Sequence, residues 1–217
     1  MSETLTALAA ALPLASGWSI HSLWMRRRID AARRDPLTGL WTRDAFTERA
    51  ERHLAARPSA VYLIDLNDFK QVNDTHGHAA GDAVIRATGE RLREGAVNTS
   101  AVVGRLGGDE FAVVAPVYSG DHLSRTLQAL TAALEQPVSV GDLALEVTAS
   151  IGAVAFDPRT DAADLSGLLR LADEQMYRAK RIGAPWLTAL SLEKEYATVN
   201  GRRAGRRGTT SGPGVAA

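Results

Sequence analysis

Three carboxylates stand where the ends of strands could bring them together. Asp65 ends an apolar run, and Asp109 and Glu110 follow a Gly-Gly pair between two further apolar runs. Charges about 4 Å apart repel by about 4 kcal/mol at an effective dielectric constant of about 20, so such a cluster needs a cation or a proton. Oxygen ligands favour Mg²⁺, and paired ions of this kind support phosphoryl and nucleotidyl transfer. The alternative is that Asp109 and Glu110 are ordinary turn residues and Asp65 an acid at a strand end.

Further polar side chains follow Asp65 along the chain. Lys70 lies in the segment LNDFK, expected to be a loop whose backbone N–H groups, with the Lys70 ammonium, could bind a triphosphate. Asn73 and Asp82 could read a purine edge, guanine especially, because a carboxylate accepts hydrogen bonds from its N1–H and N2–H₂ groups. Asp82 is also placed to be the N-cap of a following helix, and on spacing alone the N-cap is the stronger interpretation.

Several other functional classes lack their residues. His76 and His78 have the spacing of a metal-binding pair, but without a third ligand we interpret them as polar loop residues. The sequence holds no GxxxxGK[ST], HExxH or GxSxG motif, which argues against P-loop NTPases, zinc proteases of that type and α/β-hydrolases. It also holds no cysteine, which excludes disulfides, thiolate metal sites and a cysteine nucleophile. Lys+Arg and Asp+Glu both number 25, so no net charge favours a nucleic-acid partner, and we expect none.

Alternating periodicities predict the elements that position these residues. They indicate helices and strands in the following places: helices over 44–54, 81–92, 123–134 and 162–181, and strands over 60–66, 101–106, 111–115, 138–140, 143–146 and 148–156. Gly107 and Gly108 separate two of these strands, which predicts a hairpin because glycine supplies the positive φ of tight turns. Gly141 and Asp142 predict a second one. The order favours an α+β fold, a mainly antiparallel sheet covered by helices, palm-like and of the ferredoxin-like or nucleotidyl-cyclase type.

The N-terminal segment differs in character from the rest. Residues 4–25 carry no charge and are followed at once by Arg26, Arg27 and Arg28. A stretch of this length can cross a hydrocarbon core of about 30 Å, with its basic flank in the cytoplasm. Its polar residues and Pro13 leave a peripheral or dimer-forming helix as the alternative.

The chain is therefore expected to have three parts. Residues 1–34 form a hydrophobic and basic helix that contacts the membrane or serves as a dimerisation stalk. Residues 35–188 form the folded domain, in the cytoplasm or at the inner face of the membrane. Residues 189–217 form a helix remnant and a disordered tail rich in glycine and arginine, since they hold little that could be buried.

The string RLGGDEF over 105–111 resembles the signature of the GGDEF family of diguanylate cyclases. Three further segments are similar to motifs of that family in the same order: DPLTGL at 35–40, LIDLNDFKQVNDTHGHAAGD at 63–82 and DEQMYRAKRIG at 173–183. The resemblance, which extends over residues 35–185, implies that two GTP-loaded protomers of a homodimer face each other. Each ribose 3′-hydroxyl then attacks the α-phosphate of the other nucleotide, giving cyclic di-GMP and pyrophosphate.

The resemblance also implies roles for individual residues. Two Mg²⁺ or Mn²⁺ ions per active site would be held by Asp65, the Leu66 carbonyl, Asp109 and Glu110. The GTP site would consist of residues that read the base, contact the phosphates or support the loop: Asn73, Asp82, Lys70, Lys180, Phe69, Gly107 and Gly108. Catalysis would depend on Asp109, Glu110, Asp65 and Lys70, with Glu110 a further metal ligand or the base.

The sequence departs from the family pattern at some positions. Ala184 stands where an arginine commonly reaches the phosphates, and losing one charge-assisted hydrogen bond of about 1.5–3 kcal/mol would weaken GTP binding about tenfold or more. Asn98 and Ala101 replace the usual Arg-x-x-Asp pair, so product inhibition through that pair is expected to be absent. Asp82 is retained, which favours a product made from two guanine nucleotides. The alternatives are a degenerate domain that binds GTP and signals through a partner, and a small interaction protein.

Overall fold

The computed structural model describes residues 32–96, 99–162 and 164–190, with a few positions between 18 and 28. The predictions for most of residues 4–25, for residues 191–217 and for Asn98 therefore lie outside the described residues. Within the described part of the chain, no helix combines the length and apolar character needed to cross a membrane.

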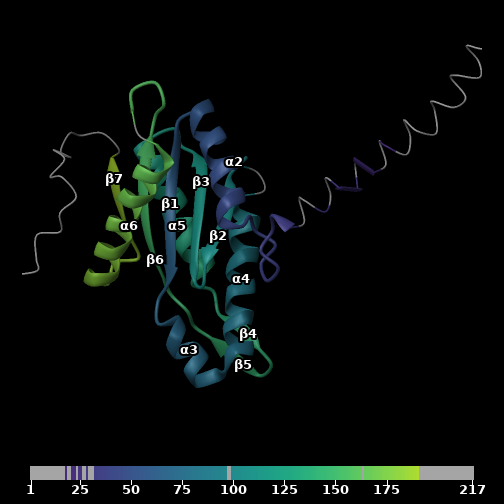
Figure 1. The fold of residues 1–217 in the computed structure, drawn as a ribbon. Coiled ribbons are helices and arrows are strands. Elements are labelled where there is room, and N and C mark those ends of the chain that lie inside the picture. The colour runs from purple at the N-terminus through teal and green to yellow at the C-terminus, as the bar shows by residue number, and fades with distance from the viewer. Residues whose placement is uncertain are drawn as a thin grey trace, which may run out of the picture.

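A five-stranded sheet in the order β2-β3-β1-β6-β7 forms the centre of the fold (Figure 1). Its strands are β1 (Ser59–Leu66), β2 (Val102–Gly107), β3 (Glu110–Pro116), β6 (Ala149–Phe156) and β7 (Trp186–Leu190). β1 pairs antiparallel with β3 and β6, and β2 antiparallel with β3, whereas β7 joins β6 in parallel. Strands β1 and β6 are buried along nearly their whole length, which explains their apolar runs. The mainly antiparallel sheet is confirmed.

Helices cover both faces of this sheet. α2 (Arg43–Ala56) and α6 (Leu165–Ile182) lie over one face, and α4 (His78–Ala96) and α5 (Gly120–Leu134) lie over the other. The short helix α3 (Phe69–His76) and the hairpin of β4 (Val138–Val140) and β5 (Leu143–Leu145) lie at the end of the molecule where β1 ends (Figure 1). Both predicted hairpins are thus present.

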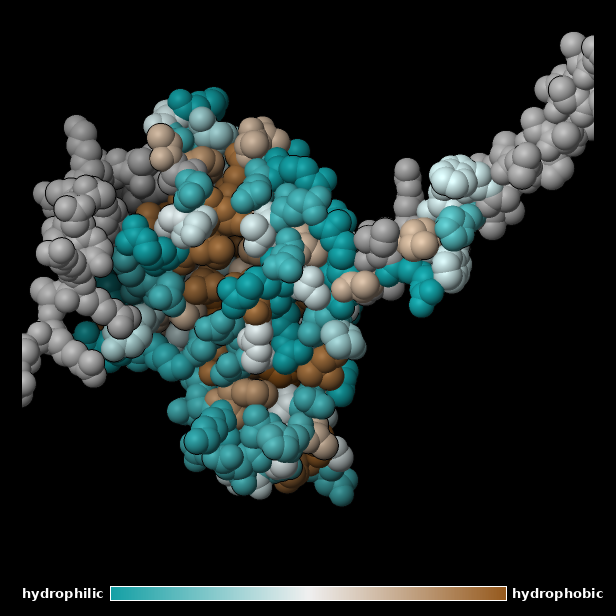
Figure 2. Space-filling view, in the orientation of Figure 1, coloured by the Kyte–Doolittle hydropathy of each residue, from teal (hydrophilic) through white to brown (hydrophobic). Residues whose placement is uncertain are grey.

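The period-two alternation of β1 divides the core into two clusters. Val61 and Leu63 pack beneath α2 and α6, while Tyr62 and Ile64 pack beneath α4 and α5. On the first face α6 lies very close to β6: a Cβ added to Gly152 would stand 1.9 Å from the carbonyl oxygen of Ala172. Figure 2 shows apolar side chains in the strip between α2 and α6, with hydrophilic side chains over the lower part of the molecule around α3.

Three local expectations differ from the structure. The chain becomes helical at Phe69, so Lys70 lies in the first turn of α3 and not in a loop. Helix α4 begins at His78, so Asp82 lies inside the helix and is not its N-cap. Strand β7 follows the last helix and extends the sheet through Leu190. The domain was expected to end at residue 188 and to be followed by a helix remnant, so the strand passes the expected boundary. Pro185 shares in this pairing, because its carbonyl accepts from the Ile151 N–H at 3.0 Å.

The segment before α2 folds back along β2. The Trp41 N–H donates to the Val103 carbonyl at 3.2 Å, and the Arg105 N–H donates to the Trp41 carbonyl at 2.9 Å. The guanidinium carbons of Arg34 and Arg49 lie 3.2 Å and 3.6 Å from the centre of the Trp41 ring, so cation–π contacts hold the indole in place.

Candidate active site

The sheet brings two of the predicted carboxylates to adjacent positions. Asp65 on β1 and Glu110 on β3 are register partners, and opposite residues of an antiparallel pair point to the same face. That face is the one covered by α2 and α6. Asp109 precedes Glu110 in the turn after Gly107 and Gly108, so the three acids lie at one end of the sheet, where the hairpin pattern predicted them.

Basic side chains from the two covering helices form ion pairs with two of these acids. Lys180 of α6 places its Nζ 2.5 Å from Asp65 Oδ2. Arg43 of α2 has its Nη2 3.6 Å from Glu110 Oε2, and its Nε donates to the Leu106 carbonyl at 3.0 Å. The two helices therefore supply the positive charge that a carboxylate pair requires.

The donor set has the chemistry of a divalent metal site. Mg²⁺ and Mn²⁺ prefer oxygen ligands, and the carboxylates of Asp65, Asp109 and Glu110 with the Leu66 carbonyl offer only oxygen. In the described part of the chain, no group of three or more acidic, histidine or cysteine side chains is close enough together to hold a metal ion. The residues fit such an ion by type, while Lys180 and Arg43 engage two of the acids.

The Gly-Gly turn exposes its backbone. Gly107 and Gly108 have φ of 154° and 49°, values that side chains rarely allow, so glycine is required to form this turn. Arg105 fixes the turn from within: its Nε and Nη2 donate to the Gly108 carbonyl at 3.0 Å and 2.8 Å. Its remaining nitrogen Nη1 lies 3.1 Å from both carboxylate oxygens of Asp35.

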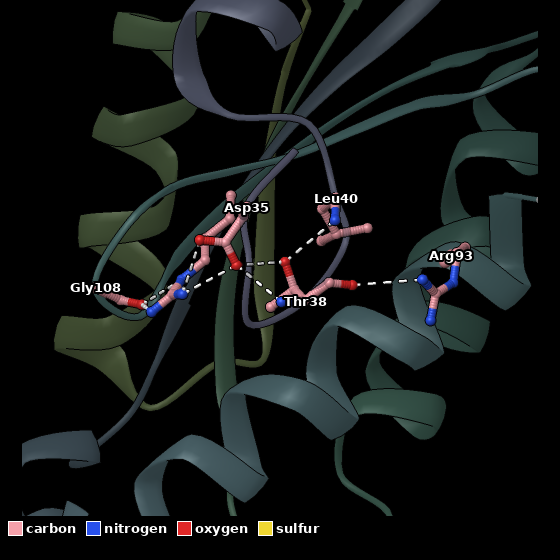
Figure 3. Close-up of polar contacts among 6 residues, drawn as sticks. Asp35, Thr38, Leu40, Arg93 and Gly108 are labelled. Carbon is pink, nitrogen blue, oxygen red and sulfur yellow. Dashed lines mark hydrogen bonds and ion pairs between the residues drawn. The ribbon is translucent and has the colours of Figure 1, made fainter. Parts of the chain in front are cut away.

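Asp35 connects this turn to helix α4 through Thr38 (Figure 3). Its Oδ1 accepts from the Thr38 N–H at 2.9 Å and from the Thr38 hydroxyl at 2.8 Å, and the Thr38 carbonyl accepts from Arg93 at 3.4 Å. Partial burial acts to raise the pKa of Asp35, but the Thr38 hydrogen bonds and the Arg105 guanidinium outweigh it and lower the pKa below its usual value.

Helices α3 and α4 bring together the residues expected to read a base. A Cβ on Gly81 would stand 2.0 Å from Asn73 Oδ1 and 3.1 Å from the Phe69 ring, so both side chains lie against the bare backbone of α4 at that point. Asp82 is the next residue of α4 and is exposed, as is Lys70 in the first turn of α3.

The loop between β1 and α3 is anchored to the sheet by a residue that the sequence did not single out. The Asn67 amide donates to the Thr148 hydroxyl at 3.0 Å and accepts from the Ser150 hydroxyl at 2.9 Å. The sequence likewise did not indicate the contacts of Arg43 with Leu106 or of Arg105 with Asp35. Their partners lie 63 and 70 residues away, at separations for which local spacing carries no signal.

The remaining predicted positions lie around this end. His76 ends α3 and His78 begins α4, and both are exposed. Ala184 follows the left-handed Gly183 after α6, and its N–H donates to the Ala179 carbonyl at 3.0 Å. Its methyl group supplies no donor for a phosphate.

Comparison with known proteins gives a consistent family assignment. The family model for "Diguanylate cyclase, GGDEF domain" matches residues 32–185. An uncharacterized 19.3 kDa protein of Streptomyces ambofaciens is 46% identical over 79% of this chain and 91% of its own length. The diguanylate cyclase DgcP of Pseudomonas aeruginosa is 35% identical over 69% of this chain, which spans only 22% of that protein. The solved GGDEF domain of Pseudomonas aeruginosa TpbB superposes with a TM-score of 0.65, at 36% identity over 73% of this chain and 94% of that one. The chain therefore belongs to the GGDEF family.

Proposed function

We propose that the protein is a diguanylate cyclase, which condenses two GTP molecules into cyclic di-GMP with release of two pyrophosphates. Membership of the family supports a role in cyclic di-GMP metabolism. The observation that carries the finer proposal is the juxtaposition of Asp65 and Glu110, opposite each other at the sheet end that also bears the Gly-Gly turn. Helices α3 and α4 follow β1 directly from this end, which brings the Asn73–Asp82 group toward the same region.

Different residues of the chain would bind the guanine base and the phosphates of GTP. Asn73 and Asp82 accept and donate hydrogen bonds along the guanine edge, with Phe69 supporting α3 against α4. The exposed turn of Gly107 and Gly108 lets a phosphate approach the backbone closely. The ammonium groups of Lys70 and Lys180 add positive charge for the phosphates.

The reaction then needs a displacement at phosphorus. The 3′-hydroxyl oxygen of one nucleotide bonds to the α-phosphorus of the other, the bond to pyrophosphate breaks, and the hydroxyl proton passes to a base, for which Glu110 is the candidate. Arg43 positions Glu110 through its ion pair and its bond to the Leu106 carbonyl. Mg²⁺ or Mn²⁺, held by Asp65, the Leu66 carbonyl and Asp109, would neutralise phosphate charge when bound. The alternative role of Glu110 is that of a further metal ligand.

One nucleotide per protomer cannot close the cyclic product alone. We therefore propose that two copies of the chain face each other through their Gly-Gly turns. The N-terminal residues 1–34 are the proposed dimerisation or membrane-contact segment, and a contact of residues 4–25 with the membrane stays a prediction.

The test is to incubate the full-length protein with GTP and Mg²⁺ and to measure cyclic di-GMP by chromatography and mass spectrometry. Asp109→Ala is expected to lower the rate about a hundredfold or more. Asp142→Ala, in the other Gly-Asp hairpin turn, is the matched control and should keep the rate of the unmodified protein. Full activity in Asp109→Ala would contradict the proposal.

A second candidate is a domain that binds GTP without turnover and signals through a partner. Ala184 favours it, and so do the ion pairs that engage Asp65 and Glu110. This candidate predicts that GTP and Mg²⁺ raise the melting temperature while no cyclic di-GMP forms. Product formation by the same sample would exclude it.

A further inference from the structure

Asn67 is joined to the start of β6 by three hydrogen bonds, at the point where β1 ends. Its backbone N–H donates to the Thr148 carbonyl at 2.9 Å. Its side-chain amide donates to the Thr148 hydroxyl at 3.0 Å and accepts from the Ser150 hydroxyl at 2.9 Å. Ser150 is 1% exposed, so the amide is bonded to the interior of the sheet. We call these three bonds between Asn67, Thr148 and Ser150 the Asn67 clamp.

The clamp fixes the direction of the Leu66 carbonyl. Leu66 and Asn67 share a trans peptide group, in which the C=O and the N–H point in opposite directions. The Asn67 N–H donates toward the β6 side, so the Leu66 C=O points to the other side of β1, where β3 lies. The pairing of β1 with β3 ends at Asp65 and Glu110, and the residue before Glu110 is Asp109. The Leu66 carbonyl is therefore directed toward the segment that carries Asp109.

The chain leaves the sheet directly after Asn67. Asp68 has φ of 53°, a left-handed conformation that residues other than glycine adopt infrequently, and α3 begins at Phe69. A conformation of this kind is strained, and it persists where surrounding contacts hold it. The bonds of Asn67 therefore resist rotation of the peptide that carries the Leu66 carbonyl.

The clamp also engages a hydroxyl next to Asp65. Ser150 is the register partner of Asp65 on β6, so the two side chains point to the same face of the sheet. A hydroxyl has one proton to donate, and that of Ser150 is donated to the Asn67 amide oxygen. The oxygens of Asp65 are thereby left to cations, and Lys180 is the cation that contacts them in this structure.

We propose that Asn67 is a positioning residue of the candidate metal site. It holds the Leu66 carbonyl toward Asp109, where this oxygen adds to those of the acids, and it contacts neither ion nor substrate. The inference rests on the proposed function, because the Leu66 carbonyl is a ligand only if a divalent ion binds here. Removing a group that orients the ligands of a metal commonly lowers the metal affinity about 10- to 100-fold.

The test measures Mn²⁺ binding to the full-length protein without nucleotide, from the loss of the free-ion signal in electron paramagnetic resonance. Asp109→Ala should abolish this binding, which identifies the site. Asn67→Ala is expected to weaken it about tenfold or more. Gln71→Ala, which removes an exposed amide from α3, is the matched control and should leave the affinity unchanged.

A second variant tests whether Asn67 acts through its two partners. Thr148→Val combined with Ser150→Ala removes both hydroxyls but keeps the Asn67 amide, and it should weaken Mn²⁺ binding by a similar factor. Adding Asn67→Ala to this variant should weaken binding no further, because the effects of residues that act as one unit do not add. Circular dichroism and urea unfolding check each chain, and the variant without the two hydroxyls replaces Asn67→Ala if that chain does not fold.

An unchanged Mn²⁺ affinity in Asn67→Ala, with or without a loss of stability, would overturn the inference alone and make Asn67 a structural residue. Full additivity of the three changes would also overturn it, since Asn67 would then act apart from its partners. No Mn²⁺ binding by the unmodified protein would overturn the metal site of the proposed function and this inference together. The failure of the inference is therefore distinguishable from the failure of the proposed function.

Discussion

Lys180 and Asp65 form the closest ion pair at the proposed site, at 2.5 Å, and its two ends differ in solvent exposure. The Lys180 side chain is 46% exposed and that of Asp65 is 16% exposed, so water screens the pair and its contribution to stability is about 1 kcal/mol or less. If the protein binds GTP as proposed, Lys180 would leave Asp65 for a phosphate at a cost of this order.

Lys180→Met is expected to raise the KM for GTP about tenfold, because a charge-assisted contact to phosphate is lost. The free energy of unfolding should change by no more than about 1 kcal/mol. Steady-state kinetics and urea unfolding measure the two effects, with Arg181→Met as the control at the adjacent position. An unchanged KM with a large loss of stability would make Lys180 a structural residue only.

Asp35 makes the stability of the fold depend on pH. Its pKa is lowered in the folded protein by Thr38 and Arg105 against the effect of burial, so its carboxylate stabilises the fold above the ordinary pKa of aspartate. This stability is lost as the pH falls through the lowered value.

Asp35→Asn should therefore reduce the free energy of unfolding by about 1–3 kcal/mol at neutral pH, where charged hydrogen bonds are lost. The difference from the unmodified protein should shrink as the pH is lowered from about 7 to about 3. Urea unfolding across this range measures it, and Asp173→Asn on the exposed face of α6 is the control. A difference that stays constant with pH would show that the charge of Asp35 does not matter.

Residue types and hairpin spacing sufficed to predict that Asp65, Asp109 and Glu110 lie at one end of the sheet. The counter-ions could not be predicted this way. Arg43 on α2 pairs with Glu110 on β3, and Lys180 on α6 pairs with Asp65, 115 residues distant in sequence. Arg105, which holds the Gly-Gly turn, pairs with Asp35, 70 residues distant. Such contacts arise from tertiary packing, and only the family resemblance indicated a role for Lys180.

Elements that depend on local signals were predicted, and elements that depend on distant partners were not. Both hairpins carry glycine turns with positive φ at Gly107, Gly108 and Gly141, which the sequence displays directly. Strand β7 has only five residues and exists because it pairs in parallel with β6, so nothing within Trp186–Leu190 identifies it. Helix α3 has only eight residues and none of them is fully buried, so it is too short to display the repeated apolar positions that mark the longer helices.

The packing of α6 on β6 leads to a prediction at Gly152. An added methyl group would stand 1.9 Å from the Ala172 carbonyl oxygen and 2.4 Å from the Met176 nitrogen, both of them backbone atoms. Gly152→Ala is therefore expected to destabilise the fold by about 1–3 kcal/mol, as over-packing does elsewhere.

Thermal and urea unfolding measure this effect, and Gly120→Ala is the matched control. A Cβ at Gly120 would meet nothing within 4 Å, and its φ is not positive, so stability should change by no more than about 1 kcal/mol. Equal effects at the two positions would show that the close approach of α6 does not limit packing.

At the scale of the whole molecule, the proposed reaction needs two loaded copies of the chain. The rate per protein molecule should therefore rise with protein concentration until dimers predominate, since a monomer holds only one of the two nucleotides. Initial rates over a wide concentration range measure this dependence.

An experiment with mixtures of variant and unmodified protein provides the control. An excess of Asp109→Ala protein should inhibit the unmodified protein by forming mixed dimers, whereas an excess of Asp142→Ala should not. A rate per molecule that is independent of concentration, together with no inhibition by Asp109→Ala, would contradict reaction across a dimer.

The backbone bonds from Trp41 to β2 have a consequence for how copies of this chain meet. β2 is the outermost strand on its side of the sheet, and an outermost strand offers free N–H and C=O groups to which another chain can add. Trp41 takes up the Val103 carbonyl and the Arg105 N–H, and its ring lies between two guanidinium groups that would resist a second strand. The segment that ties Asp35 to the Gly-Gly turn thus also covers the β2 edge of the sheet and opposes the addition of a strand from a second chain there.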